Sequence, residues 1–222
     1  MTVFSADGTR LLTSSDDRTA RLWDAETGQE LLKLSHPDKV RCVAFSPGGE
    51  FLVTGCDDGF VRFWDITSGR PALKPLTHGE RVRCLEFNAE GNRLAVACGY
   101  SGTGGEVHVW DWRNDNPAHK PSLSAARIYH TAFARDGRWL VASDADGASH
   151  LWRLDGLSQG GFALRHNRAV SNSAFSPDGS RLLTTSLDST WRIWGLETEK
   201  AQSISVPGGQ RQVHLAPDGT TL

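Results

Sequence analysis

Residues 40–69 read VRCVAFSPGG, EFLVTGCDDG and FVRFWDITSG, and they show the structural pattern of the chain most clearly. Each piece is a short run of apolar and β-branched residues that ends in Gly, Asp, Pro or Ser. This pattern predicts three strands joined by turns. A fourth run around Leu73–Leu76 completes a small antiparallel sheet. In the first strand, Val40, Val43 and Phe45 interrupt the strict alternation once, which predicts a β-bulge there.

The same pattern recurs along the whole chain with a regular period. Five tryptophans close corresponding strands: Trp23, Trp64, Trp110, Trp152 and Trp194. A phenylalanine precedes the Trp by the same interval in four repeats, as Phe45 precedes Trp64, and by a longer one in the third, which therefore contains a four-residue insertion. No segment has sustained helical spacing. Such a repeat predicts an all-β chain of small sheets, because one repeat cannot bury its apolar face alone.

The residues around these tryptophans form a recognisable signature. Asp follows the Trp in three repeats, and Arg or Gly follows it in the other two: Trp23-Asp24, Trp64-Asp65, Trp110-Asp111, Trp152-Arg153 and Trp194-Gly195. A histidine stands shortly before the first strand of three repeats: His36, His78 and His166. On these residues the sequence resembles the WD-repeat β-propeller family, of a bacterial type. The resemblance covers the whole chain and implies blades of four antiparallel strands.

The resemblance also implies how the chain is organised. We expect a single propeller domain over residues 1–222. Its expected repeats are 1–33, 34–75, 76–121, 122–163 and 164–205, with a partial repeat at 206–222. Propellers of this family usually have about seven blades. We therefore expect these five blades to be part of a longer propeller that the chain leaves incomplete.

Composition argues against several classes of protein. The 222 residues contain 24 Lys and Arg against 26 Asp and Glu, for a net charge of −2. This balance does not favour a general nucleic-acid or membrane-surface binder. The apolar runs are too short to span a bilayer, and the start of the chain lacks the segments of a signal peptide. Four cysteines without a disulfide pattern suit a reducing compartment, so we expect a cytoplasmic protein.

The resemblance implies a structural hydrogen-bond network in each blade, from the turn before the blade to its Trp. The expected members are Ser15, Asp17 and Trp23 in the first repeat, His36, Asp58 and Trp64 in the second, and His166, Ser186, Asp188 and Trp194 in the fifth. A catalytic Ser–His–Asp triad uses the same residue types. A triad occurs once per active site, however, whereas this set recurs. We therefore expect a role in folding and no enzymatic activity.

The cysteines also follow the repeat. Cys42 and Cys84 are one repeat period apart, as are Cys56 and Cys98, so each pair occupies equivalent positions in neighbouring blades. Such positions lie too far apart for a disulfide. There is no Cys-x-x-Cys and no histidine at a zinc-binding spacing. Other histidines, among them His108, His130 and His150, are scattered over the repeat positions. We expect no metal and no other cofactor.

Basic residues flank the start of the inner strands in three successive repeats. By the resemblance, these positions surround the top mouth of the central channel, next to the glycine-rich insertion that contains Tyr100. The set is Lys39, Arg41, Arg81, Arg83, Arg127 and Tyr129. Such a surface fits an acidic or phosphorylated peptide. The alternative is a solvated rim with local ion pairs, to which Asp16 and Asp57 contribute.

These features predict a non-catalytic scaffold that binds peptide segments of partner proteins on the top face of the propeller. An alternative is a regulatory or sensor module of a larger signalling protein, such as a bacterial protein kinase. An enzyme would need one acid–base cluster that does not recur, and the sequence has none. Nucleic acid is not the expected partner, because only one aromatic residue accompanies the basic residues. The oligomeric state is left open.

Overall fold

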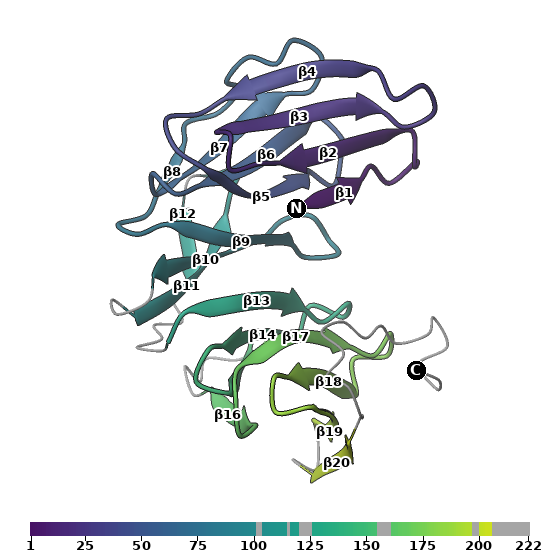
Figure 1. Cartoon of the computed structure of the whole chain (residues 1–222), viewed down its shortest axis with the longest axis vertical. Coiled ribbons are helices and arrows are strands. Elements are labelled where there is room, and N and C mark those ends of the chain that lie inside the picture. The colour runs from purple at the N-terminus through teal and green to yellow at the C-terminus, as the bar shows by residue number, and fades with distance from the viewer. Residues whose placement is uncertain (101–103, 115, 120–125, 155–160, 197–199, 206–222) are drawn as a thin grey trace. The chain divides into compact units, whose positions relative to one another are not determined.

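The computed structural model describes residues 1–100, 104–114, 116–119, 126–154, 161–196 and 200–205. These residues form five antiparallel sheets of four strands each, and consecutive strands are neighbours in every sheet (Figure 1). The all-β prediction and the four-stranded repeat are therefore confirmed. Among the described residues, no helix has the length and apolarity that crossing a membrane requires.

The strands follow the repeats of the sequence. The first sheet consists of β1 (Thr2–Phe4), β2 (Arg10–Ser14), β3 (Thr19–Asp24) and β4 (Glu30–Ser35). The second consists of β5 (Val40–Phe45), β6 (Phe51–Cys56), β7 (Phe60–Asp65) and β8 (Leu76–Thr77). The third consists of β9 (Val82–Phe87), β10 (Leu94–Tyr100), β11 (Gly104–Asp111) and β12 (Asn116–His119). The fourth consists of β13 (Ile128–Phe133), β14 (Trp139–Asp144), β15 (Ala148–Arg153) and β16 (Phe162–Arg165). The fifth consists of β17 (Val170–Phe175), β18 (Arg181–Ser186), β19 (Thr190–Gly195) and β20 (Lys200–Ser205).

The predicted bulge in the first strand of the second repeat is confirmed. Val40 pairs with Cys56 and Cys42 pairs with Gly55, so Arg41 is the extra residue. The same shift leaves Arg83 as the extra residue in β9, Tyr129 in β13 and Ser171 in β17. A bulge redirects the side chain of its extra residue relative to the pleat. Three of these four positions belong to the predicted binding surface.

The chain divides into two compact units. The first contains residues 1–100 and 108–120, and the second contains residues 101–107 and 121–222. In the first unit, one core cluster joins the first two sheets through residues such as Leu22, Val43 and Leu52, all nearly or fully buried. In the second unit, Val141, Leu151 and Leu182 are buried in a cluster shared by the fourth and fifth sheets. The expectation of a single domain over the whole chain stays a prediction.

Candidate functional site

A hydrogen-bonded set of three side chains lies inside the second sheet. His36, in the turn after β4, has its Nε2 2.8 Å from Oγ1 of Thr54 on β6. Trp64 on β7 donates its indole N–H to the same oxygen at 2.9 Å. His36 Nδ1 lies 3.1 Å from the Leu34 carbonyl oxygen, which can only accept. We therefore assign the proton to Nδ1, so that Nε2 accepts the Thr54 hydroxyl proton.

Burial keeps this histidine neutral. His36 is 8% exposed, and burial lowers its pKa to about 4 despite the backbone hydrogen bond to Leu34. Thr54 is fully buried, so no substrate can reach its hydroxyl group. The set satisfies buried polar groups, and its geometry offers no nucleophile for catalysis.

The fifth sheet repeats the arrangement and extends it to a carboxylate. His166 Nε2 and the Trp194 indole N–H meet Thr184 Oγ1 at 2.7 and 2.8 Å. His166 Nδ1 lies 3.1 Å from the hydroxyl of Thr190, which donates to Asp188 at 2.6 Å. Burial opposes the ionisation of Asp188, but hydrogen bonds from Thr190 and the Asn167 backbone hold its pKa well below the usual range.

The described contacts of the predicted serines and of Asp17 and Asp58 are to residues other than a histidine or a Trp, and the contact of Asp17 with Thr19 is equivalent to that of Asp188 with Thr190. Ser186 donates to the Arg168 carbonyl at 2.9 Å. In the first sheet, Ser15 accepts from the backbone N–H of Asp17, and Asp17 accepts from the Thr19 hydroxyl. In the second sheet the position equivalent to Thr19 is a phenylalanine. Asp58 instead pairs with Arg62 at 2.7 Å, and no described contact joins it to His36.

The hub of the network is a threonine that the sequence analysis did not single out. Thr13, Thr54 and Thr184 each accept the indole N–H of the Trp ten residues later, including Trp23 in the first sheet. The fixed interval was visible in the repeat. Threonine is common in strands for reasons of packing alone, so its recurrence did not by itself predict a hydrogen bond to the Trp.

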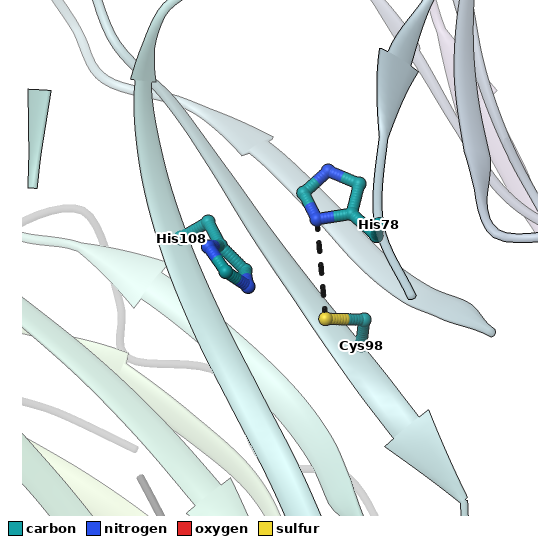
Figure 2. A group of neighbouring side chains, drawn as sticks. All are labelled: His78, Cys98 and His108. Carbon is teal, nitrogen blue, oxygen red and sulfur yellow. Dashed lines mark hydrogen bonds between the residues drawn. The ribbon is translucent and has the colours of Figure 1, made fainter. Parts of the chain in front are cut away.

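The third sheet lacks this hub, because Val96 occupies the threonine position. Among the described residues, neither His78 Nε2 nor the Trp110 indole nitrogen has a hydrogen-bond partner, and both are buried. His78 Nδ1 lies 4.0 Å from Cys98 Sγ (Figure 2). The centroids of the His78 and His108 rings are 4.9 Å apart. Burial, together with the neighbouring His108, lowers the pKa of His78 to about 3, so its ring is neutral.

The basic residues of the first unit gather around a buried carboxylate. Arg41 donates to Asp57 Oδ2 from Nε at 2.9 Å and from a terminal nitrogen at 2.7 Å. Terminal nitrogens of Arg81 and Arg83 lie 3.7 and 3.9 Å from the same carboxylate. Burial opposes the ionisation of Asp57, but the hydrogen bonds from Arg41 hold its pKa below the ordinary value.

An exposed carboxylate lies at the edge of this group. Asp16 accepts from Arg41 at 2.8 Å and pairs with Lys39 at 3.3 Å. We call Lys39, Arg41, Arg81 and Arg83 the cationic cluster. Asp16 and Asp57 form the described ion pairs of this cluster, and Asp38 also acts electrostatically on Arg41.

The other predicted binding residues belong to a different part of the chain. Arg127 and Tyr129 lie in the second unit, where the Arg127 guanidinium is 5.1 Å from the centre of the Tyr129 ring. Tyr129 is 39% exposed. The side chain of Tyr100 and residues 101–103 of the insertion lie outside the described residues.

Comparison with known proteins identifies a family that matches most of the chain and relatives that cover about half of it. The chain matches the family described as WD domain, G-beta repeat, over residues 1–24, 28–65, 71–111, 117–153 and 162–195. It is 33% identical over 110 residues to Protein LST8 homolog from Drosophila melanogaster, covering 46% of this chain and 34% of that protein. It is 29% identical over 122 residues to Target of rapamycin complex subunit LST8 from Bos taurus, covering 47% and 36%.

A third relative is U3 small nucleolar RNA-associated protein 21 from Saccharomyces cerevisiae, 30% identical over 140 residues, which cover 59% of this chain and 14% of that protein. The chain thus spans about a third of the length of the LST8 relatives. All three relatives come from eukaryotes, so they give no support to the predicted bacterial type. The first match covers the first three strands of the first sheet, and each later match covers the last strand of one sheet with the first three strands of the next. The chain belongs to the WD40 repeat family.

Proposed function

We propose that this protein is a non-catalytic scaffold and that its cationic cluster binds an acidic or phosphorylated segment of a partner protein. Membership of the WD40 repeat family supports the scaffold role. One relative is named as a subunit of a complex, which fits a protein that works by binding others. The burial of the Thr54 hydroxyl in the recurring network also supports a role without catalysis. The cytoplasmic location and the regulatory-module alternative stay predictions.

The observation that carries the proposal is the difference in solvent exposure among the side chains of the cationic cluster. Arg41 is only 24% exposed and is held by Asp57, whereas the side chains of Lys39 and Arg81 are 45% and 42% exposed. A buried carboxylate at the centre thus fixes the inner guanidinium, while two cationic groups stay accessible at the edge. An anionic side chain or phosphate would receive charge-assisted hydrogen bonds from these outer groups.

The experiment compares two double charge reversals in the first unit. Lys39→Glu with Arg81→Glu changes the accessible part of the cluster. Lys33→Glu with Arg70→Glu makes the same change in net charge at exposed positions elsewhere. The probes are fluorescein-labelled hexaglutamate and the same peptide with a central phosphoserine, measured by fluorescence anisotropy at low salt because salt screens exposed charges.

We expect the cluster variant to bind at least tenfold more weakly than the wild-type protein, and the control variant to lose less than threefold. Added salt should weaken wild-type binding. Equal losses in the two variants would show that net charge alone attracts the peptides. Wild-type protein that binds neither peptide would rule out the proposed ligand class.

A further inference from the structure

The third sheet differs from the first, second and fifth sheets at the positions that build the buried network, and the fourth sheet, with Ala142 and His150 there, also departs from the pattern. Val96 replaces the hub threonine, so the third sheet has no hydroxyl group between its histidine and its Trp. His108 occupies the position of an arginine in three other repeats: Arg21, Arg62 and Arg192. Cys98 occupies the position of Ser15 and Ser186. The second sheet also has a cysteine at this position, Cys56, but only the third sheet combines that thiol with two histidines and no hydroxyl group at the threonine position.

The histidine of this sheet is also oriented differently. In the second sheet, Nδ1 of His36 donates to the carbonyl of Leu34, two residues earlier. In the third sheet, Nδ1 of His78 instead faces the Cys98 sulfur at 4.0 Å. Figure 2 shows this nitrogen and the sulfur pointing toward each other, with the His108 ring beside them.

We propose that His78, Cys98 and His108 form a binding site for a zinc ion. One donor atom from each residue lies within 4.8 Å of the others. The three residues come from separate segments, since His78 follows β8, Cys98 lies on β10 and His108 lies on β11. The sheet therefore supplies two ligands from neighbouring strands, and the turn before β9 supplies the third.

The donor set fits zinc chemically. Thiolate and imidazole are preferred zinc ligands, and this set contains no hard oxygen donor that would favour Mg²⁺ or Ca²⁺. At the tetrahedral angle, zinc–nitrogen and zinc–sulfur bonds of about 2.0 and 2.3 Å place two nitrogens about 3.3 Å apart and a nitrogen and a sulfur about 3.5 Å apart. The His78–Cys98 separation of 4.0 Å lies close to the latter distance. A pair at the 4.8 Å limit would have to approach by up to about 1.5 Å, which requires rotation of the side chains.

Burial distinguishes this group from a chance surface cluster. His78 is 7% exposed and Cys98 is 1% exposed, while His108 is partly exposed. A zinc ion would bind the Cys98 sulfur as thiolate and release the thiol proton to solvent. The partly exposed His108 side gives the ion a path of entry, and a water molecule would complete four-coordination there. The proposal concerns the interior of the third sheet and does not depend on the cationic cluster.

The test uses the full chain prepared without metal. Zinc affinity and stoichiometry are measured by competition with a chromophoric chelator. Co²⁺ serves as a second probe, because a cysteine thiolate bound to Co²⁺ produces a sulfur-to-metal charge-transfer absorption. We expect one tightly bound zinc ion per chain and a charge-transfer band that saturates at one equivalent of Co²⁺.

The repeat itself supplies variants that should fold. Cys98→Ser and His108→Arg each introduce the residue that other sheets carry at the same position. Each should weaken zinc binding at least tenfold, and Cys98→Ser should abolish the charge-transfer band. The matched control is Cys56→Ser, the equivalent change in the second sheet, which should leave both readouts unchanged.

Three results would overturn the assignment. The first is wild-type protein that competes with the chelator for no zinc. The second is a Co²⁺ complex without the charge-transfer band, which needs no variant and so does not depend on how the variants fold. The third is zinc affinity that falls equally in Cys56→Ser and Cys98→Ser, which would indicate general thiol binding.

Discussion

Arg41 donates two hydrogen bonds to a single carboxylate oxygen of Asp57, at 2.9 and 2.7 Å, and the Asp57 side chain is only 2% exposed. Arg41 is the extra residue of the β5 bulge, so the bulge directs its guanidinium toward this buried charge. The cationic cluster thus has a fixed inner part and an accessible outer part. The fixed part contributes to stability, and the outer part is the one proposed to bind a partner.

Arg41→Ala should therefore destabilise the fold. It leaves the buried Asp57 carboxylate without its two hydrogen bonds, and hydrogen bonds to charged groups contribute about 2 kcal/mol to the free energy of unfolding. Lys39→Ala is the control, because the exposed Lys39–Asp16 pair should contribute less than about 0.5 kcal/mol. Urea unfolding at pH 7 measures both. Equal losses in the two variants would contradict the distinction between the inner and outer parts.

The hub threonine gives a pair of opposite predictions. Thr54→Val removes the partner of both His36 and Trp64, so the free energy of unfolding should fall by about 2–3 kcal/mol. Val96→Thr places a hydroxyl group where His78 and Trp110 have unsatisfied buried nitrogens, and it should raise that free energy by about 1 kcal/mol. Urea unfolding tests both variants. If Val96→Thr destabilised the protein as much as Thr54→Val, the hub interpretation would be wrong.

Stability should fall as the pH is lowered from 7 to 5. Burial lowers the pKa of His36 to about 4, with Arg62 reinforcing this shift and Asp58 opposing it. In the unfolded chain the same group titrates near its ordinary pKa of 6.5. Between these values the unfolded chain binds the proton and the folded chain does not, so lower pH favours unfolding. The expected loss from His36 is about 2 kcal/mol.

The measurement is urea unfolding of the wild-type protein and of His36→Gln at pH 7 and pH 5. The variant should lose about 2 kcal/mol less than the wild-type protein over this interval. The Asp7 and Asp178 carboxyls, whose pKa values of about 2 reflect hydrogen bonds from Ser5 and Ser176, stay ionised throughout it. Identical pH profiles for the two proteins would contradict the assignment of a buried neutral His36.

At two equivalent turns in the second unit, gaining a glycine and losing a glycine should have opposite effects on stability. Ser189 adopts a φ of 66°, in the left-handed region that suits glycine, and Gly147 has a φ of 87°. Ser189→Gly should stabilise the protein by about 1 kcal/mol by relieving this backbone strain. Gly147→Ala should destabilise it by about 2 kcal/mol or more, because the added Cβ would lie 2.7 Å from the His166 carbonyl oxygen. Thermal unfolding of both variants checks the two signs.

Much of the fold could be predicted because its signals are local. The strand runs, the Gly–Asp–Pro turns and the regular period lie within short windows, and they identified five four-stranded sheets. Even the bulge at Arg41 was visible, as an interrupted alternation between Val40 and Val43. The predicted position of the fourth strand in the second repeat, around Leu73–Leu76, was less accurate. The ladder there is confined to Leu76–Thr77, since Pro71 and Pro75 cannot donate hydrogen bonds.

The contacts that carry the proposals depend on pairing across strands. The repeat, the strand faces and the positions of the basic residues could all be predicted from the order of the residues. The contacts between Thr54, His36 and Trp64, the burial of Asp57 under Arg41, and the proximity of His78, Cys98 and His108 follow only from the folded arrangement of the strands. Zinc motifs are recognised when ligands are close in sequence, but antiparallel register brings together residues that are far apart in the chain. The ligands of such a site have no characteristic spacing in the sequence from which it could be predicted, because the pairing of the strands sets the distances between the donor atoms.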